Sequence, residues 1–240
     1  LADIVTGSNA FPHNDEPEIV LKAAKKILQK DGHFIVEIMY AGDLLEQLQW
    51  DSMYHEHLSY FCAATLEVLL NRFGFHMVDV EHLPMHAGSL RVAAAVNPKE
   101  KPKPSVGELF KEEKEKRLTE VETWQNFSKI VQRRIKIAKE VMKKLSQTNR
   151  IWAYGAAGRA TMWVNACQMD YLEAIVDSSP LRSGRLMPGT HTPIVFPEAL
   201  RYNPPDYIFV TAWNYLETIK TKEDWFKGIW VVPLPELRFF

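Results

Sequence analysis

The sequence predicts an α/β protein in which two regions of alternating strands and helices flank a long helical segment. Short apolar runs with strand spacing recur on both sides of the middle of the chain. A stretch rich in Lys and Glu with helical spacing separates them, and a proline cluster precedes that stretch. We therefore expect an α/β region over residues 1–97, a linker and long helix over 98–148, and a second α/β region over 149–240.

The first region opens with the pattern of a strand, a helix and a second strand. Residues 3–8 and 33–40 have strand patterns, and residues 16–29 carry apolar side chains at helical spacing. Lys30-Asp31-Gly32 is expected to end the helix. Parallel strands joined in this way leave an open edge at the first strand, which needs further strands beside it. The pattern thus favours a fragment of a longer domain.

Further along, residues 63–73 are expected to form a helix, and residues 75–81 and 90–96 to form strands. The segment 97–104 cannot continue either element well, because its three prolines fix φ and remove hydrogen-bond donors. An apolar stripe over residues 105–145 then predicts one long helix whose charged residues face solvent.

The second region resembles a nucleotide-binding βαβ unit in its order of elements. A strand at 151–154 leads into the small-residue turn 155–160 and a helix at 161–169, and a strand at 174–177 ends in Asp177. The turn can serve a nucleotide's pyrophosphate, or it can simply permit close packing of strand and helix. Its two glycines depart from the three-glycine dinucleotide pattern, which disfavours an NAD-dependent enzyme. Further strands are expected at residues 207–211 and 228–232.

Composition excludes several broad classes of protein. The 29 basic and 30 acidic residues leave a net charge of -1, so no footprint for nucleic acid or an anionic membrane is visible. No apolar run approaches the roughly 20 residues of a membrane span, and no targeting segment is recognised. Cys62 and Cys167 lie far apart without metal-type spacing. We expect a reduced, cytoplasmic setting and no protein-bound metal.

Tyr54-His55-Glu56-His57 is where we expect the chemistry, because it packs two imidazoles, a carboxylate and a phenol into consecutive positions. In an extended segment His55 and His57 share one side, while Tyr54 and Glu56 share the other. A histidine is the natural proton acceptor near neutral pH when a neighbour orients it. A hydrogen-bonded structural loop, or a metal site that uses His55, Glu56 and His57, are the alternatives.

Several motifs together are similar to the ordered signature of one enzyme family. They are Tyr54-His55-Glu56-His57-Leu58-Ser59-Tyr60-Phe61, His86-Ala87-Gly88-Ser89-Leu90-Arg91, Tyr154-Gly155-Ala156-Ala157-Gly158-Arg159, Gly184-Arg185-Leu186-Met187-Pro188-Gly189-Thr190-His191 and Ala212-Trp213-Asn214. The signature resembles that of the sugar C-methyltransferases, which use S-adenosylmethionine to methylate a nucleotide-linked keto-deoxysugar. The resemblance runs from residue 2 to about residue 232, and the Tyr-His-Glu-His segment is its most specific part.

The resemblance implies an architecture. Family members have a small zinc-binding N-terminal domain, a class I methyltransferase domain and a C-terminal Rossmann-like domain. Residues 1–97 resemble the last part of the methyltransferase sheet, with residues 3–8 as its fourth strand, and residues 149–240 resemble the domain that binds the sugar nucleotide. The zinc cysteines and the glycine-rich cofactor loop would lie upstream. We therefore expect an incomplete S-adenosylmethionine site and weak or no binding of this cofactor by the 240 residues alone.

The resemblance also implies roles for individual residues. His57 matches the base that removes a proton next to the sugar ketone and gives an enolate, while Tyr54 and Glu56 would orient the sugar or the imidazole. Asn9 and His13 match a region near the methyl donor. Expected substrate contacts are His55 beside the base and six residues of the later motifs, His86, Ser89, Arg91, Gly155, Arg159 and Asn214. Asp177, at the end of its strand, is expected to accept a substrate hydroxyl.

Some of these contacts have structural alternatives. His86 to Arg91 can be a strand-entry turn, and Asp177 can cap a turn. Arg159 stands where many relatives have lysine, which leaves its geometry open, because arginine can bind two phosphate oxygens at once. A non-catalytic sugar-nucleotide or dinucleotide-binding module remains the alternative function. A deoxythymidine-diphosphate sugar is the ligand we expect first; the sugar, the methylated carbon and the oligomeric state are not set by the sequence.

Overall fold

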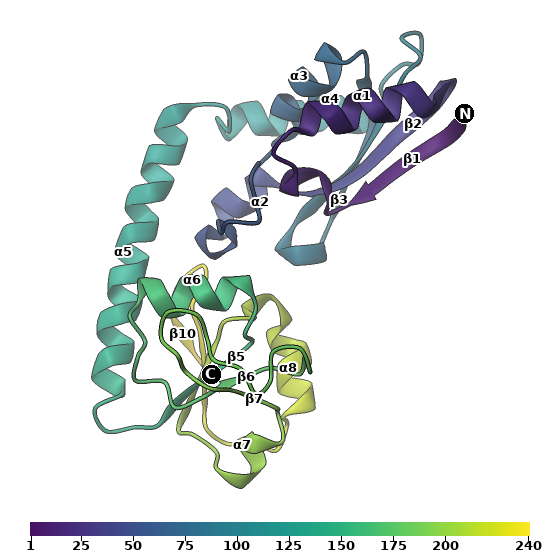
Figure 1. The fold of residues 1–240 in the computed structure, drawn as a ribbon. Coiled ribbons are helices and arrows are strands. Elements are labelled where there is room, and N and C mark those ends of the chain that lie inside the picture. The colour runs from purple at the N-terminus through teal and green to yellow at the C-terminus, as the bar shows by residue number, and fades with distance from the viewer. The chain divides into compact units, whose positions relative to one another are not determined.

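A computed structural model describes residues 1–240, which pack as two compact units (Figure 1). Unit 1 consists of residues 1–46 and 55–127, and unit 2 of residues 47–54 and 128–240. The two units do not follow the predicted ranges 1–97, 98–148 and 149–240, because the predicted linker is shared between them. The short segment 47–54 leaves the chain's first region and packs within unit 2. The α/β class predicted from the sequence is confirmed.

Unit 1 is built on a four-stranded mixed sheet. Its strands are β1 (Ala2–Ser8), β2 (Leu28–Met39), β3 (His76–Leu83) and β4 (Ser89–Ala95), in the order β1-β2-β4-β3. The first two strands run parallel and are joined by α1 (Pro17–Ile27), which confirms the βαβ pattern. The other neighbours pair antiparallel. The first strand is therefore an edge of this sheet.

The first helix is shorter than the expected range of 16–29. It ends at Ile27, and Leu28 already pairs with Ala2 in the sheet. An irregularity in this pairing lets residues 28–32 belong to the strand rather than to a helix end. Helical spacing alone placed this boundary too late. Leu28 is apolar and buried, so it fits the last turn of a helix as well as the first position of a strand.

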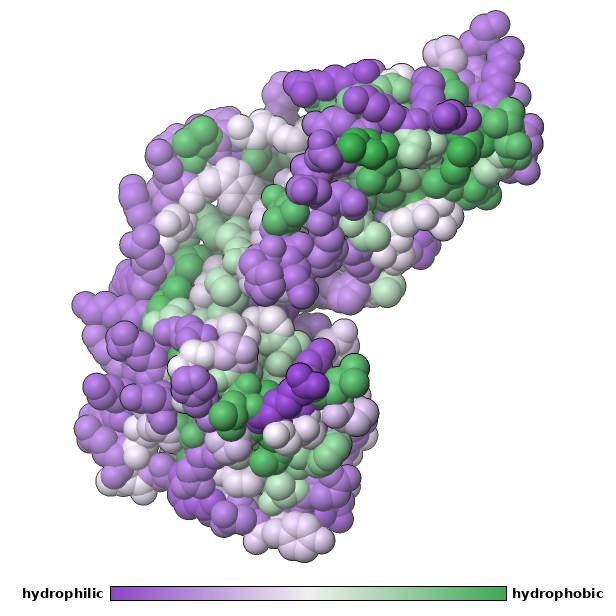
Figure 2. All heavy atoms as spheres, in the orientation of Figure 1, coloured by the Kyte–Doolittle hydropathy of each residue, from purple (hydrophilic) through white to green (hydrophobic).

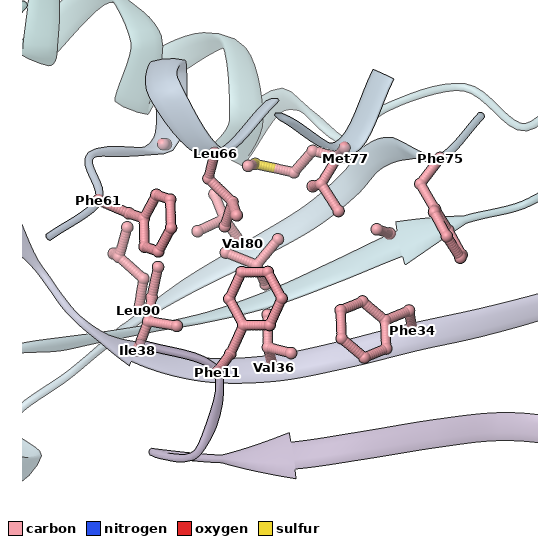
Figure 3. Close-up of a cluster of buried hydrophobic side chains, with 14 of the residues drawn as sticks. Phe11, Phe34, Val36, Ile38, Phe61, Leu66, Phe75, Met77, Val80 and Leu90 are labelled. Atoms are coloured by element: carbon pink, nitrogen blue, oxygen red, sulfur yellow. The ribbon is translucent and has the colours of Figure 1, made fainter. Parts of the chain in front are cut away.

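The core of unit 1 lies on one face of its sheet. Phe34, Val36 and Ile38 alternate along β2 and point toward α1, α3 (Ala63–Arg72) and α4 (Pro104–Glu115), as Figure 3 shows for the strand side of the cluster. A strand places alternate residues on opposite faces, so one face is apolar and the other carries charge. The short helix α2 (Ala41–Glu46) follows the second strand.

Hydrophobic surface is visible over the β1 edge of unit 1 (Figure 2). Ile4 in the middle of this strand is 55% exposed. An edge strand presents unpaired N–H and C=O groups in addition to such side chains.

The predicted single helix over 105–145 is wrong, since the structure has α4 (Pro104–Glu115) and α5 (Val121–Leu145) with a break between them. Arg117 adopts a left-handed backbone with φ of 54°, which ends the first helix. Leu118 is then buried in the core of unit 1, and its carbonyl accepts a hydrogen bond from Trp124 Nε1 at 2.8 Å. Burial of this side chain outweighs the helical propensity of the surrounding Lys and Glu residues.

Unit 2 is a doubly wound sheet with helices on both faces. Its strands are β5 (Ile151–Tyr154), β6 (Ile175–Val176), β7 (Ile194–Val195), β8 (Tyr207–Val210), β9 (Ile229–Val232) and β10 (Arg238–Phe239), in the order β10-β9-β8-β5-β6-β7. The last strand is antiparallel, and every other pair is parallel. The chain winds one way from β5 to β7 and the other way from β8 to β10, so a topological switch lies between β5 and β8.

Helices cover unit 2 as expected for a parallel sheet. The four residues of β5 are all buried. Trp163 of α6 (Gly158–Ala166) packs against Phe209 with ring centroids 5.5 Å apart, and Leu200 and Ile219 belong to α7 (Ala199–Tyr202) and α8 (Leu216–Lys222) in the cluster on the other face. The α6 helix begins three residues before the expected Thr161. No helix is long and apolar enough to cross a membrane.

Candidate active site

Two loops of unit 1 bring His57 against His13. The 3-10 turn η1 (Phe11–His13) follows β1, and its Pro12 carbonyl accepts hydrogen bonds from the backbone N–H groups of Leu58 and Ser59, each at 3.1 Å. The rings of His13 and His57 then meet edge to face with centroids 4.9 Å apart. Residues 44 positions apart in the sequence thus share one site.

Aromatic packing fixes the far side of this site. Phe61 enters the core and packs on Phe11 with ring centroids 5.7 Å apart. Tyr60 stands edge to face with His57 at 6.4 Å between centroids. The half-buried His57 imidazole is therefore held between a second imidazole and a phenol ring, whereas His55 and Glu56 are exposed on a turn. A positioned, partly desolvated imidazole has the character of a general base.

Asn9 and His13 lie at the carboxyl end of β1, the end at which parallel α/β sheets bind ligands. Asn9 has a left-handed backbone with φ of 50°, and its N–H donates to the Glu37 carbonyl at 2.9 Å. The turns after the strands of unit 1 carry no cluster of glycines. An incomplete methyl-donor site stays a prediction. No group of three or more His, Cys, Asp or Glu residues is placed to hold a metal ion.

The motif from His86 to Arg91 forms a strand entry. His86 lies in the 3-10 turn η3 (Met85–Ala87) with φ of 56°, and the buried Ser89 hydroxyl donates to the Met85 carbonyl at 3.0 Å. Arg91, in β4, bridges Glu37 and Glu81 on the neighbouring strands, at 2.7 and 2.8 Å. The Arg91 hydrogen bond, followed by that of Ser8, lowers the pKa of Glu37 below its usual range. A substrate contact by these three residues stays a prediction.

A cavity of about 310 Å³ in unit 2 opens at the carboxyl ends of β5, β6 and β8. This is the topological switch point, where open α/β sheets bind ligands. Gly155 needs to be glycine here, since its φ is 99° and a Cβ would come within 2.8 Å of Ala212. The lining residues come from three loops and from α8: Tyr154, Gly155, Ala157, Asp177, Ser178, Arg182, Ala212, Tyr215, Thr218, Ile219 and Lys222.

Asp177 joins two of the loops that line the cavity. Its Oδ2 accepts the N–H of Ala156 at 2.7 Å, and its Oδ1 accepts the N–H of Ser179 at 2.8 Å. The buried carboxylate also contacts Arg182, whose NH1 lies 3.2 Å from Oδ2. Asp177 thus caps both turns, which is the structural alternative given above, and it also contacts a cation at the cavity wall. Acceptance of a substrate hydroxyl by Asp177 stays a prediction.

Arg182 and Lys222 line the cavity but were not predicted from the sequence. Neither stands in a motif or at a strand end, and only the fold of unit 2 brings α8 and the loop after β6 together. Asn214 lies in the 3-10 turn η4 (Trp213–Tyr215), one residue before Tyr215, which lines the cavity.

Arg159 and Tyr54 make contacts within unit 2 that the sequence did not indicate. Arg159 donates to Asp51 Oδ1 at 3.1 Å and to Gln49 Oε1 at 3.0 Å, and it does not line the cavity. Tyr54 packs its ring on Gly158, where a Cβ would lie 2.7 Å from its Cζ. The glycine at 158 therefore provides room for a residue of the Tyr-His-Glu-His segment. Phosphate binding by Arg159 stays a prediction.

Comparison with known proteins identifies the two regions of the chain. Residues 84–235 match the C-methyltransferase C-terminal domain, and residues 1–80 match a methyltransferase domain. C-methyltransferase NovU of Streptomyces niveus is 33% identical over 245 aligned residues, which include 99% of this chain and 58% of NovU. The chain therefore spans little more than half the length of this relative.

Two solved structures share a distant likeness. A complex of the Haloferax volcanii Trm112 methyltransferase activator with a methyltransferase aligns at a TM-score of 0.34, with 15% identity over 40% of this chain and 54% of that one. The pyocyanin biosynthetic protein PhzM aligns at 0.32, with 22% identity over 39% of this chain and 30% of its own. TM-scores this low do not establish a shared fold. The C-terminal-domain match covers residues 84–235, which is more than half of the chain, and shows that the chain belongs to the C-methyltransferases.

Proposed function

We propose that this chain contributes the proton-abstracting and nucleotide-binding parts of an enzyme that methylates a nucleotide-linked keto-deoxysugar at the carbon next to its ketone. The observation that carries the proposal is the half-buried His57 imidazole, held between His13 and Tyr60 at the carboxyl end of β1. S-adenosylmethionine, the methyl donor that the family implies, would supply an electrophilic methyl group. Asn9 and His13, which follow β1, are the residues of this chain that we propose lie near this donor.

The proposed chemistry begins at the carbon beside the ketone. His57 takes the proton from this carbon, and the electron pair of the C–H bond moves into the carbonyl, which gives an enolate. The proton stays on the imidazole nitrogen, so charge is balanced between imidazolium and enolate. A neutral histidine does this only if its ring is held in one orientation, which the contacts with His13 and Tyr60 provide. Tyr54 and Glu56 are proposed to orient the sugar or the imidazole.

The cavity of unit 2 supports a nucleotide-linked substrate. Its volume of about 310 Å³ lies at the lower end of the range for ligand pockets. Arg182 and Lys222 bring two cations to its wall, and a diphosphate is the ligand group that such cations bind well. We therefore assign the diphosphate to these two side chains and to the turn that begins at Gly155. His55, His86, Ser89, Arg91, Arg159, Asp177 and Asn214 remain proposed contacts of the substrate.

A non-catalytic sugar-nucleotide-binding module is the second candidate, because the cavity in unit 2 does not depend on His57. Hydrogen exchange separates the two functions. The full-length gene product is incubated in deuterated buffer with a deoxythymidine-diphosphate keto-deoxysugar and no methyl donor, and the proton signal beside the ketone is followed by NMR. An enzyme-dependent loss of this signal supports the methyltransferase. Saturable binding with exchange no faster than in buffer would establish the binding module instead.

A further inference from the structure

A buried carboxylate, six residues before His57 in the sequence, is held by donors from the rest of unit 2. Asp51 lies in the 3-10 turn η2 (Trp50–Ser52), and its side chain is fully buried. We propose that Asp51 is a positioning residue, which anchors the chain just before Tyr54 and so sets the geometry of the segment that carries the proposed base. This inference rests on the proposed function for its catalytic consequence, but not for the anchor itself.

Three donors from unit 2 converge on the Asp51 carboxylate. Trp163 Nε1 and Trp213 Nε1 donate to Oδ2 at 3.0 and 2.8 Å, and Arg159 donates to Oδ1 at 3.1 Å. The guanidinium also stacks over the Trp213 ring at 5.0 Å from its centroid. Each donor comes from an element that starts just beyond β5 or β8, at the carboxyl ends of these strands.

The neighbours of Asp51 are buried with it. Gln49 and Ser52 are 1% and 0% exposed, and the Ser52 hydroxyl donates to the Gln49 carbonyl at 2.7 Å. Trp50 packs on Trp163 with ring centroids 4.7 Å apart. The segment is therefore an integral part of unit 2 although it belongs, in sequence, to the first region.

A charge at this place calls for an explanation other than stability. Burial raises the pKa of Asp51 above its usual range, opposed by Arg159 and the two indole donors. Apolar residues of similar volume often stabilise a protein as well as a buried ion pair does. What the charged cluster adds is a set of hydrogen bonds with fixed directions. Hydrogen bonds from three directions leave the carboxylate one orientation, and the backbone of η2 is fixed with it.

The anchor acts on the segment through the chain. Tyr54 lies three residues after Asp51, with its ring against Gly158 in the turn at the cavity. His57 lies six residues after Asp51, which a fully extended chain spans with about 20 Å. The proposed effect of η2 on His57 therefore acts along this short covalent connection. Misplacement of a reacting group by about 1 Å can lower a rate by about 100-fold.

Trp213→Phe is the most informative change, because it removes one donor and keeps an aromatic ring beneath Arg159. Asp51→Asn is the stronger change and puts an amide N–H₂ group among N–H donors. The matched control is Glu173→Gln. Glu173 also accepts hydrogen bonds from an arginine and an indole of unit 2, namely Arg150 at 2.7 Å and Trp152 at 3.1 Å. It precedes β6 in the sequence and contacts the amino end of β5, opposite to the end where the cavity opens.

Two measurements on the full-length gene product test the anchor. Amide hydrogen exchange, read by mass spectrometry, should become at least about tenfold faster over residues 47–57 in Trp213→Phe, with β5 and β8 unchanged. Methyl transfer should show kcat lowered by about 10- to 100-fold, with KM for the sugar nucleotide within about twofold of wild type. Glu173→Gln should change neither, even where it lowers Tm.

Unchanged amide exchange over residues 47–57 in Trp213→Phe overturns the anchor. An equal loss of kcat in Glu173→Gln overturns it as well, because the effect is then a general loss of stability. Failure of the proposed function has a different signature: the wild-type protein would not exchange the proton beside the ketone, whatever the amide exchange shows.

Discussion

Two buried carboxylates hold loops of unit 2. Asp177 accepts backbone N–H groups from two turns of unit 2, and Asp51 accepts two indoles and a guanidinium. A carboxylate that receives several donors stays satisfied away from water, which makes it suited to fix a loop. At the scale of the residue, the placement of these loops of unit 2 depends on the two acids.

Gly88 is a residue at which both the backbone conformation and the neighbouring side chain require glycine. Its φ is 122°, and a Cβ there would overlap the carboxylate of the buried Asp43. Gly88→Ala should therefore lower the free energy of unfolding by about 1–3 kcal/mol, read from urea titration. Gly107→Ala is the control, since it lies in α4 with nothing near its added Cβ. We expect that change to stabilise the chain by up to about 1 kcal/mol; equal effects of the two would contradict this interpretation.

At the scale of the element, Glu113 links two helices of unit 1. It lies in α4, is 2% exposed, and accepts the N–H groups of Ala63 and Ala64 at 2.6 and 2.8 Å. These are the first residues of α3, so a carboxylate from another helix satisfies donors that the helix itself leaves unpaired. The start of α3 directly follows the segment that carries His57.

Glu113→Gln should show what this link contributes. The change places an amide N–H₂ group near one of the helix donors, and we expect the free energy of unfolding to fall by about 2–3 kcal/mol. The exposed neighbour Glu112 provides the control, because Glu112→Gln should change stability by less than about 0.5 kcal/mol. Urea titration of both variants decides the point, and a small effect at residue 113 would mean that solvent replaces the carboxylate.

Most elements could be predicted because their pattern is local. The βαβ unit and the strand at 151–154 follow from apolar spacing alone, and the structure has both. The break at Arg117 was not visible, since it depends on the burial of Leu118 in a core assembled from distant segments. The strands β7 and β10 escaped for a related reason: each has only two residues, too few for periodicity to show.

The candidate site was predictable in part. The Tyr-His-Glu-His segment stands out in the sequence through its density of proton-handling groups. The residues that contact it in the structure have no such mark in the sequence. The contact of His13 with His57 follows from two backbone hydrogen bonds to Pro12, and the burial of Asp51 from two tryptophans more than 100 positions away. Nothing in the sequence distinguishes Asp51 from a solvated acid.

At the scale of the whole molecule, the packing units do not follow the chain. Residues 47–54 leave the first region to join unit 2, so the segment with Tyr54 and His57 begins in one unit and ends in the other. This division lies between Tyr54 and His55. The segment is thus a covalent connection between the unit that holds the proposed base and the unit that holds the proposed nucleotide cavity.

Lys222 tests the assignment of the nucleotide to unit 2. It lies at the end of α8, exposed and at the wall of the cavity, so Lys222→Gln should leave Tm within about 1 °C. Loss of one charge from a diphosphate site should weaken binding of deoxythymidine diphosphate by about 5- to 50-fold, measured by isothermal titration. Lys227→Gln, outside the cavity, should bind as wild type does. Equal affinity in both variants would place the nucleotide elsewhere.

The most direct measurement of the central claim is solvent hydrogen exchange beside the ketone by His57→Gln in the full-length gene product, with His76→Gln as the control. His76 is a histidine of unit 1 whose Nε2 contacts the Glu100 carbonyl at 2.8 Å, away from the proposed base. If His57 is the base, His57→Gln should lose at least about 100-fold in exchange rate while its affinity for the sugar nucleotide stays within about threefold. His76→Gln should exchange as wild type does. Undiminished exchange by His57→Gln would contradict the assignment of the base.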